Sequence, residues 1–442
     1  MSATPSRPGG FADLDDWLAW LETLHPKKID LGLERIVAVL ASLGLAEPKY
    51  RVITIGGTNG KGSCVALLES IYREAGYRVG AYTSPHLWRF NERMRIDMQE
   101  ATDAEIVDVF HEIDSTRGDI TLSYFEYATV AAMLWFARRD VDVAILEVGL
   151  GGRLDAVNAM DPDASMIVSI DLDHQAWLGE TRSAIAFEKA GIMRSGRPTI
   201  VADPQPPATL LSQADKVGSQ LLLAGRDFDH DTVTKASWSY RSISGDLLRL
   251  PMPTFGGLVQ SRNAAACVAV TEALALELPV SEEGLARGIA GAEVHARFER
   301  HSVLGVEWVF DVAHNPAAAR ILATELKSDP CSGRTFAVFA AMADKDVVGV
   351  VGPLISLVDE WSTVRVGDTR GTDAETLAEL LRSNGARVVT AAPDVTSACE
   401  KFRDSARPID RVVVFGSCYI VGPAMTALGL YCAPSSTDAV SS

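Results

Sequence analysis

The sequence predicts an α/β protein, in which a P-loop domain with a mostly parallel sheet precedes a second, smaller Rossmann-like α/β domain. Short β-branched runs alternate with longer segments of helical periodicity, which is typical of a parallel sheet covered by helices on both faces. The stretch "VITIGGTNGKGSC" at residues 52–64 joins one such run to a helix through a glycine-rich turn. A fresh strand and helix series after about residue 294 predicts domains 1–294 and 295–442.

Individual elements follow from the spacing of apolar residues. Helical intervals of three and four predict amphipathic helices at 14–24 and 33–43, and then helices at 61–75, 185–193 and 263–276. Buried strands of the first domain are expected at 52–55, 79–82, 143–146 and 166–170. Strands of the second domain are expected at 307–310, 335–340, 363–366, 388–390 and 412–415. The proline-containing stretch 202–253 predicts irregular structure with a hairpin, and the tail after residue 433 predicts disorder.

Composition narrows the classes of function. The formal net charge is −17 and no Lys/Arg-rich block occurs, which argues against a nucleic-acid surface. The six cysteines lack C-x-x-C spacing, so neither a zinc site nor a disulfide framework is indicated. The N-terminal residues are acidic, unlike a secretory signal, and no apolar run reaches the roughly 18 residues that span a bilayer. We therefore expect a cytoplasmic protein that contacts neither nucleic acid nor membrane.

The glycine-rich turn predicts a phosphate-binding loop for ATP. Its glycines let backbone N–H groups turn toward phosphate oxygens, and Lys61 adds a full positive charge. Gly62 stands where the usual pattern has a metal-binding hydroxyl, and Ser63 follows one position late. The predicted nucleotide-binding residues are Gly57, Thr58, Asn59, Gly60, Lys61, Gly62 and Ser63. The alternative is a glycine-rich turn that binds nothing.

A displaced hydroxyl places the expected Mg²⁺ ligands at the ends of neighbouring strands. Ser84, Glu147 and His174 each follow or end a predicted strand, and the carboxyl ends of parallel strands share one edge. A hydroxyl and a carboxylate suit Mg²⁺, although imidazole is not one of its usual ligands. Singly, the three also fit a turn serine, a strand-end acid and a loop histidine.

Six motifs, in this order and spacing, resemble the folylpolyglutamate synthase/dihydrofolate synthase family of the Mur ligase superfamily. They are "GTNGKGS", "SPHLWRFNER", "EVGLGGRLDAVN", "DHQAWLGETRSAIAFEKAGIMR", "DVAHNP" and "GSCYIV". The resemblance runs from "HPKKIDLGLERI" to about Pro423. It implies an ATP-dependent amide ligase that joins L-glutamate to a folate-type acid, and we expect Mg²⁺ and a monovalent cation as cofactors beside ATP.

The resemblance also assigns residues of the first domain. Lys189 matches a lysine that is carboxylated to a carbamate, which would provide an anionic oxygen near Mg²⁺. A surface helix lysine is the alternative. Phe125 is expected to stack on the pterin ring, Asp155 to accept hydrogen bonds from its N–H groups, and Arg93 to approach the substrate. Phe125 fits a core aromatic equally well. The acid at Asp155 resembles bacterial bifunctional members, which take dihydropteroate and reduced folates.

The second domain is expected to hold glutamate. Asp311, His314 and Ser417 match positions of this kind, with Asp311 orienting His314 or helping to remove a proton from the amine. The resemblance also implies that Arg297 reaches an ATP phosphate and that Gln260 and Asn263 contact the nucleotide. Lys345 resembles a further family motif, although a solvated lysine is an equally good interpretation.

The predicted reaction has two steps. The acid attacks the γ-phosphate of ATP to form an acyl phosphate, and the amine of glutamate then displaces phosphate, so that ADP and phosphate are released. The alternatives are a P-loop kinase for a small acceptor, a nucleotide-binding module without turnover, and a peptidoglycan-precursor ligase of the Mur type. We expect a monomer.

Overall fold

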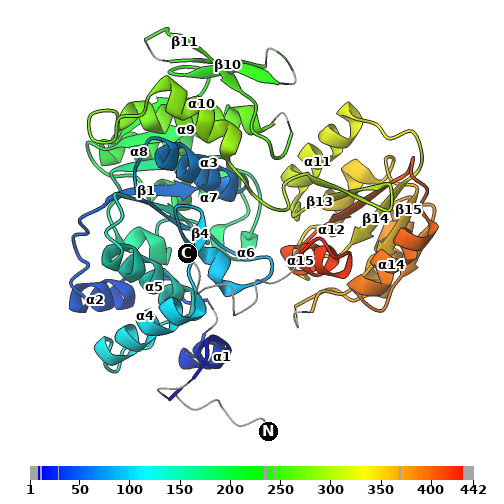
Figure 1. The fold of residues 1–442 in the computed structure, drawn as a ribbon, viewed down its shortest axis with the longest axis horizontal. Helices are drawn as coiled ribbons and strands as arrows, with labels where there is room; N and C mark the ends of the chain where they lie inside the picture. Colours follow the sequence, from blue (N-terminus) through cyan, green and yellow to red (C-terminus); the bar gives the residue numbers. More distant parts are fainter. Residues whose placement is uncertain are drawn as a thin grey trace. The chain divides into compact units, whose positions relative to one another are not determined.

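A computed structural model gives the fold of the chain (Figure 1). The structure describes residues 8–9, 12–27, 29–232, 234, 236–242, 244–257, 259–367 and 370–431. Two compact units are present: unit 1 is Met1–Ile170, Thr181–Thr254 and Ser261–Ala292, and unit 2 is Asp171–Glu180, Phe255–Gln260 and Glu293–Ser442. The expected disorder after residue 433 concerns positions outside the described residues.

Two short segments in the middle of the chain group with unit 2. Residues 171–180 and 255–260 both precede the predicted boundary near residue 294. A single domain boundary therefore cannot describe how the chain divides into the two units. Both are too short to change the composition or the periodicity of the sequence around them. The assignment of nucleotide binding to the first part and of glutamate binding to the second stays a prediction.

Unit 1 contains an eight-stranded sheet in the order β4-β3-β2-β5-β1-β6-β7-β8. Strands β2, β5, β1, β6, β7 and β8 run parallel, whereas β3 is antiparallel to β2 and β4 to β3. The predicted mostly parallel sheet is thus confirmed. The strands are β1 (Arg51–Gly56), β2 (Val79–Tyr82), β3 (Met94–Ile96), β4 (Gln99–Glu100), β5 (Val143–Glu147), β6 (Ala164–Ile167), β7 (Pro198–Val201) and β8 (Gln220–Leu223).

Helices cover both faces of this sheet. In Figure 1, α3, α9 and α10 lie on the opposite side of β1 from α4 and α5. The helices of unit 1 are α1 (Leu14–Leu24), α2 (Glu34–Ser42), α3 (Lys61–Glu74), α4 (Asp103–Thr116), α5 (Tyr124–Arg138), α7 (Arg182–Ala190), α8 (Ala208–Val217), α9 (Val259–Ala273) and α10 (Glu282–Gly291), with the 3-10 turns η1 (Phe90–Arg93) and η2 (Ala156–Ala159). Helix α10 packs closely on α3, because a Cβ on Gly288 would lie 2.4 Å from Ile71 Cα.

The region 202–253 has more regular structure than the sequence predicts. It contains α8, β8 and a three-stranded antiparallel sheet of β9 (Asp229–Thr232), β10 (Ser237–Arg241) and β11 (Leu247–Pro251). The sheet buries Trp238 and Tyr240 on one face, while the residues between them stay exposed or half-buried. A strand of five residues with only two buried aromatics gives a weak periodic signal.

Unit 2 contains a six-stranded sheet in the order β12-β13-β17-β14-β15-β16, which is parallel except for β12. Its strands are β12 (Glu299–Val303), β13 (Val306–Asp311), β14 (Thr335–Phe339), β15 (Glu360–Thr363), β16 (Val389–Ala391) and β17 (Arg411–Phe415). Its helices are α6 (Gln175–Leu178), α11 (Pro316–Ser328), α12 (Val347–Val351), α13 (Ala374–Ser383), α14 (Val395–Ser405) and α15 (Cys418–Ala427), with the turn η3 (Gly352–Leu354). Phe339, Trp361 and Phe415 form an aromatic cluster in its core.

Two differences from the predicted second domain have simple causes. Strand β12, "ERHSV", was not predicted, since its alternate residues are only half-buried and three of its five residues are charged or histidine. Strand β15 lies three residues earlier than expected because Trp361 and Thr363 pair with β14 and β16, whereas Val364 and Val366 are buried beyond the strand.

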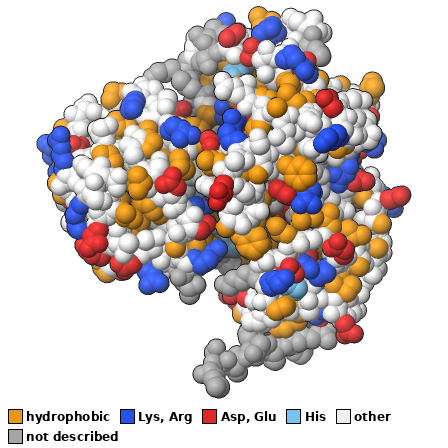
Figure 2. Space-filling view, turned by 180° about the vertical axis from the view of Figure 1, so that it is seen from behind, with side chains coloured by type: hydrophobic (Ala, Val, Ile, Leu, Met, Phe, Trp, Pro, Cys, Tyr) orange, Lys and Arg blue, Asp and Glu red, His pale blue; other side chains and the backbone are white. Residues whose placement is uncertain are grey.

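The surface carries charges of both signs. On the face seen in Figure 2, Lys and Arg side chains are interspersed with Asp and Glu. Among the described residues, no helix combines the length and the apolar character that a membrane span requires.

Candidate active site

The glycine-rich loop connects β1 to α3 at the carboxyl edge of the large sheet. Gly60 precedes α3 with φ 87°, in the left-handed region that favours glycine. A Cβ at Gly60 would lie 2.8 Å from Val168 Cγ1, and one at Gly57 would lie 3.1 Å from Val168 Cβ. At Gly57 and Gly60 the loop therefore lies directly against the chain that follows β6, and the space at these two positions is too narrow for a side chain.

Ser169 fixes this loop, although the sequence analysis did not single it out. Its carbonyl accepts the Thr58 N–H at 2.8 Å, and its hydroxyl accepts the Asn59 N–H at 2.9 Å and donates to Asn59 O at 3.0 Å. A serine two residues beyond the end of β6, a buried strand that pairs with β1, was the available signal. A Cβ at Gly60 would also meet Asn263 Oδ1 at 3.3 Å, so the predicted contact residue Asn263 lies beside the loop.

The side chains of Lys61 and Ser63 differ in their hydrogen bonding. Lys61 Nζ donates to Gly57 O at 3.1 Å and to Thr58 O at 3.4 Å, so the ammonium lies over its own loop. The Ser63 hydroxyl is buried and finds no hydrogen-bond partner within the part of the chain that the structure describes. A buried hydroxyl without a partner is unfavourable, and this one fits a loop that receives phosphate oxygens.

Ser84 and Glu147, two of the three predicted metal ligands, lie together beside the loop. Glu147 ends β5 opposite Ile55 of β1, and Tyr82 of β2 pairs with Leu146. The Ser84 N–H donates to Glu147 Oε2 at 3.1 Å. A buried carboxylate that accepts from the backbone of a serine places two residue types that suit a hard cation such as Mg²⁺ in one spot.

His174, the third predicted ligand, belongs to unit 2. It precedes α6 with φ 50°, and its N–H donates to Asp173 Oδ1 at 2.8 Å. Within the described ranges, no cluster of three His, Cys, Asp or Glu side chains has the geometry of a metal site. The complete ligand set stays a prediction. Gln260 also belongs to unit 2, and its contact with the nucleotide likewise stays a prediction.

Lys189 is almost fully buried, at 3% exposure, so the alternative of a surface lysine is wrong. It lies in the last turn of α7, which packs on the loop after Glu147. A Cβ at Gly152 would lie 3.3 Å from Lys189 Cα, and the Arg153 N–H donates to Glu188 O at 2.8 Å. Lysine is rarely buried this deeply, which agrees with a modified or charge-paired side chain.

Asp155 is a buried carboxyl at the start of η2. Its Oδ2 accepts the Leu150 N–H at 2.8 Å and its Oδ1 accepts the Val157 N–H at 3.0 Å. Burial raises the pKa of Asp155 to about 7, although these hydrogen bonds and the charge of Lys61 act in the opposite direction. The carboxyl of Asp155 is thus within electrostatic reach of the loop lysine.

Arg93 and Phe125, the other residues expected at the pterin, both contact an aromatic group centred on Tyr82. The ring centres of Phe125 and Tyr82 are 6.1 Å apart. Burial raises the pKa of the Tyr82 hydroxyl to about 12, although the charge of Arg93 acts in the opposite direction. Arg93 Cζ also lies 5.7 Å from the ring centre of Tyr124. Phe125 is half-buried, and a Cβ on Gly149 would lie 2.6 Å from its ring.

His86 completes this group and was not predicted. Its Nδ1 accepts a hydrogen bond from Arg93 Nε at 2.9 Å. Burial, and then the charge of Arg93, lower the pKa of His86 to about 4, so the ring is neutral at pH 7. The motifs "SPHL" and "YFEYAT" carry His86, Tyr124 and Phe125, and their closeness to Arg93 depends on the turn between β2 and η1.

In unit 2, Asp311 holds the turn that contains Arg297. Its Oδ2 accepts the Phe298 N–H at 2.9 Å and its Oδ1 accepts the Ala313 N–H at 2.7 Å. Ala296 and Phe298 have φ values of 57° and 50°, an uncommon conformation for residues with a side chain. Burial raises the pKa of Asp311, and the charge of Arg297 lowers it.

Val312 and Asp173 orient His314, instead of the Asp311 that the sequence predicts. His314 Nδ1–H donates to Val312 O at 2.9 Å, and His314 Nε2 lies 3.3 Å from Asp173 Oδ2. The carboxylate of Asp311 instead accepts from backbone N–H groups. The alternative that Asp311 orients His314 is therefore wrong, because the partner comes from residues 171–180, far away in the sequence. The other alternative, that Asp311 helps to remove a proton from the amine, stays a prediction.

Asp173 also accepts from Asn315 Nδ2 at 3.0 Å and lies 2.5 Å from Lys345 Nζ. The side chain of Lys345 is only 9% exposed, so the interpretation as a solvated lysine is wrong. Ser417 caps α15 by accepting the Tyr419 N–H at 3.3 Å, two residues beyond the strand position that pairs with Asp311. Asp311 and Ser417 therefore lie at the same edge of the smaller sheet.

The chain thus combines a glycine-rich loop on a mostly parallel sheet with a second α/β unit, and its similarity to known proteins identifies the class. The family model of the Mur ligase glutamate ligase domain matches residues 296–418. A dihydrofolate synthase/folylpolyglutamate synthase from Escherichia coli is 43% identical over 421 residues, which cover 95% of this chain and 97% of that protein. Its counterpart from Haemophilus influenzae is 39% identical, with 92% and 96% covered.

Solved structures agree with these relatives over nearly the full length. The structure of E. coli FolC with DHPP and ADP has a TM-score of 0.90 and 41% identity, covering 96% of this chain and 99% of that chain. The structure of a bifunctional folylpolyglutamate synthase/dihydrofolate synthase with Mn, AMPPNP and L-glutamate bound has a TM-score of 0.88 and 38% identity, covering 96% of this chain and 100% of that chain. The chain belongs to the dihydrofolate synthase/folylpolyglutamate synthase family.

Proposed function

We propose that this chain is an ATP-dependent ligase that adds L-glutamate to dihydropteroate and to reduced folates. The observation that carries the proposal is the placement of Asp155, which is buried and interacts electrostatically with both Tyr82 and Lys61. This arrangement suits an acid whose ring binds at the buried carboxyl and whose own carboxylate reaches the phosphate loop. The bifunctional names of the bacterial relatives support both substrates.

The ring of the acid substrate is held by residues of unit 1. Phe125 offers a half-buried aromatic face for stacking, and Asp155 accepts hydrogen bonds from ring N–H groups. Arg93, whose Nε is already bonded to His86, directs its remaining N–H groups to the substrate. Neutral His86 keeps this arginine in place without adding a second charge.

The phosphoryl transfer takes place at the loop. A carboxylate oxygen of the acid attacks the γ-phosphorus, the bond to the β-phosphate oxygen breaks, and ADP leaves. Backbone N–H groups from Gly57 to Ser63 and the Lys61 ammonium bind the phosphates. Ser84 and Glu147, with His174, would hold Mg²⁺, which supplies charge neutralisation on the phosphoryl oxygens. Lys189 as a carbamate would add an anionic oxygen beside that metal.

The amide bond forms with glutamate that is held by unit 2. The amine attacks the acyl carbon, phosphate leaves, and the amine loses its proton. Asp311, His314 and Ser417 bind the incoming glutamate at the edge of the smaller sheet, and Arg297 contacts an ATP phosphate. The glutamate ligase domain match over residues 296–418 supports this role for unit 2.

Product analysis tests the proposal. The protein is incubated with MgATP and L-glutamate plus either dihydropteroate or tetrahydrofolate, and the products are weighed by mass spectrometry. Glutamylated products and ADP with phosphate are expected from both acids. AMP with pyrophosphate, or a stable phosphorylated acid such as a kinase would release, would contradict the proposal. Use of a peptidoglycan precursor in place of the pterin acid would identify the Mur-type alternative.

We also propose a monomer in the cytoplasm that uses a monovalent cation. Cys64, Cys267, Cys331, Cys399 and Cys418 are free, which suits a reducing compartment. Light scattering at micromolar concentration tests the monomer. Turnover with K⁺ in place of Na⁺, at constant ionic strength, tests the cation.

A further inference from the structure

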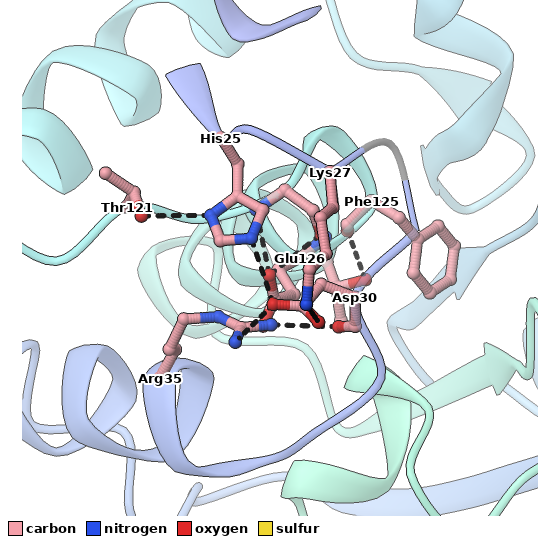
Figure 3. A network of polar contacts seen from close by, with 9 residues as sticks. His25, Lys27, Asp30, Arg35, Thr121, Phe125 and Glu126 are labelled. Atoms are coloured by element: carbon pink, nitrogen blue, oxygen red, sulfur yellow. Dashed lines mark hydrogen bonds and ion pairs between the residues drawn. The ribbon is translucent and has the colours of Figure 1, made fainter. Parts of the chain in front are cut away.

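Polar networks hold a loop in each unit. In unit 1, Arg35 of α2 lies 2.8 Å from Asp30 Oδ2 through Nη1 and 3.1 Å from Glu126 Oε1 through Nη2, so it joins the loop before α2 to α5 (Figure 3). In unit 2, Glu299 holds the turn that contains Arg297. The proposed function assigns Arg297 to an ATP phosphate, so the network around Glu299 bears on the reaction itself.

The Arg297 turn, which comprises residues 296–298, has a strained backbone. Ala296 and Phe298 have φ values of 57° and 50°, in the left-handed region that residues with a side chain rarely adopt. Both side chains are buried, at 0% and 7% exposure, whereas Arg297 between them is only half-buried. A conformation of this kind persists only where the surrounding contacts impose it, and it is found most often at functional sites.

Glu299 imposes the first part of this turn. Its Oε2 accepts the Ala296 N–H at 2.7 Å. Two histidines hold the same carboxylate, since His295 Nδ1 lies 3.2 Å and His301 Nε2 lies 2.8 Å from Glu299 Oε1. Burial alone would raise the pKa of Glu299, but these hydrogen bonds lower it to about 2. The carboxylate is therefore ionised at pH 7 and accepts with both of its oxygens.

Asp311 and the end of β13 impose the second part. Asp311 Oδ2 accepts the Phe298 N–H at 2.9 Å, and the Val312 N–H donates to Ala296 O at 3.1 Å. The backbone is thus hydrogen-bonded on both sides of Arg297. A guanidinium that is already oriented loses less freedom when it binds a phosphate, and a preorganised charge is most effective in phosphoryl transfer.

We propose that Glu299 is a positioning residue for phosphoryl transfer, because it fixes the Arg297 turn and thereby the direction in which Arg297 meets the ATP phosphate. This inference rests on the proposed function. His295 and His301 support the carboxylate, and neither they nor Glu299 need to touch ATP. Glu299 then affects the reaction only through Arg297, which is a property that can be measured.

A double-mutant cycle with Arg297→Ala tests this dependence. With dihydropteroate as the acid, Glu299→Ala should lower kcat for ADP release about tenfold, and Glu299→Gln should lower it about threefold, because an amide oxygen can still accept the Ala296 N–H. In the Arg297→Ala background, the same two changes should lower kcat by less than about twofold, since residues that act as a unit are not additive. The KM for dihydropteroate should stay within about twofold of the wild-type value throughout.

Glu360→Gln is the matched control. Glu360 lies on β15 of the same sheet, and its side chain is 17% exposed where that of Glu299 is 18% exposed. It also pairs with two basic side chains, Arg334 and Lys401, but it lies outside the Arg297 turn. Glu360→Gln should leave kcat within about twofold of the parent protein, both with and without Arg297→Ala.

Two results would overturn the inference. One is an unchanged kcat in Glu299→Ala, and the other is an equal loss of kcat in the presence and in the absence of Arg297, as a purely structural role would give. If Arg297→Ala keeps the wild-type kcat, the inference also fails, while the ligase function stands. If the wild type neither ligates glutamate nor releases ADP, the proposed function itself fails. If circular dichroism shows that Glu299→Ala does not fold, Glu299→Gln decides by the same comparison.

Discussion

Lys345 Nζ lies 2.5 Å from Asp173 Oδ1, and both side chains are less than one-tenth exposed. Burial alone would raise the pKa of Asp173, but the hydrogen bond from His314 and the charges of His174 and Lys345 hold it well below its usual range. Asp173 is therefore ionised at neutral pH, and the groups that pair with it compensate for the burial of its charge.

Replacing Lys345 by Met should destabilise unit 2. The change leaves a buried carboxylate without the ammonium that lies 2.5 Å from it, and breaking a buried pair typically costs about 3–5 kcal/mol. Lys401→Met is the control: Lys401 pairs with Glu360 at 2.8 Å but is 38% exposed, so its loss should cost less than about 1 kcal/mol. Urea unfolding measures both. The double variant Asp173→Asn with Lys345→Met should recover part of the loss, and equal losses in the two single lysine variants would contradict the argument.

Gly60→Ala should weaken ATP binding by more than it weakens the fold. The left-handed φ makes alanine unfavourable by about 1–2 kcal/mol, and the added Cβ would meet Val168 Cγ1 at 2.8 Å, so the loop must move. Gly44 has φ 73° but open space around it, which makes Gly44→Ala the matched control for strain alone. Calorimetry with a non-hydrolysable ATP analogue should show weaker binding only for Gly60→Ala. Equal affinities in the two variants would count against the role of the loop.

Asp155→Asn should change how stability depends on pH. The pKa of Asp155 is raised to about 7 in the folded state from 3.8. Between these values the folded protein keeps a proton that the unfolded chain has lost, so the contribution of Asp155 to stability falls as pH rises through this window. The difference in unfolding free energy between wild type and variant should shrink from pH 4 to pH 8, by about 4 kcal/mol at most.

The same group predicts the pH dependence of substrate binding. Only ionised Asp155 accepts hydrogen bonds from ring N–H groups with both oxygens, so affinity for dihydropteroate should rise as pH increases toward 8. Asp155→Asn should remove this rise. A wild-type affinity that is flat between pH 6 and pH 8 would show that Asp155 does not face the ring.

Lys61→Ala should lower turnover by about a thousandfold, since charge neutralisation in phosphoryl transfer is worth several kcal/mol. The fold should survive, because within the described part of the chain Lys61 Nζ donates hydrogen bonds to Gly57 O and Thr58 O, which belong to its own loop. ADP release by a coupled assay measures the effect, and circular dichroism checks the fold. Ligation within tenfold of wild type would remove Lys61 from its assigned role.

Lys189→Arg should remove a carbamate signal. Wild-type protein in ¹³C-bicarbonate is expected to show a carbamate carbon by NMR, because the buried amine needs an anionic form to serve a metal. Arginine keeps the charge but cannot form this adduct. The same signal in both proteins would assign it to another amine.

The buried strands and the placement of the glycine-rich loop were predictable because they depend on local patterns. The β-branched runs before Gly57 and at Glu147 specify buried parallel strands, and topology then brings Lys61 and Glu147 to one edge. The roles of individual side chains were less accessible. Phe125 reads as a core aromatic in sequence, and only the folded chain shows that its ring is half-buried against Gly149.

The partners of Asp173 and Arg35 depend on contacts between distant segments. Asp173 meets Lys345 across 172 positions, and Arg35 meets Glu126 across 91. No periodicity or spacing within either segment encodes such a pair. Sequence reasoning therefore predicted that Lys345 has a role or is solvated, and could not decide between them.

The inclusion of Asp171–Glu180 in unit 2 bears on any attempt to exchange parts between relatives. A chimera joined near residue 292 would take Asp171 and Asp173 from one parent and Asn315, Arg320 and Lys345 from the other. Arg320 lies 3.1 Å from Asp171 Oδ2, so both ion pairs would then have to be matched between donors. The two parts of this enzyme can thus be exchanged only between relatives that preserve both pairings. This restricts recombination more than in a protein whose two units are each encoded by one continuous segment.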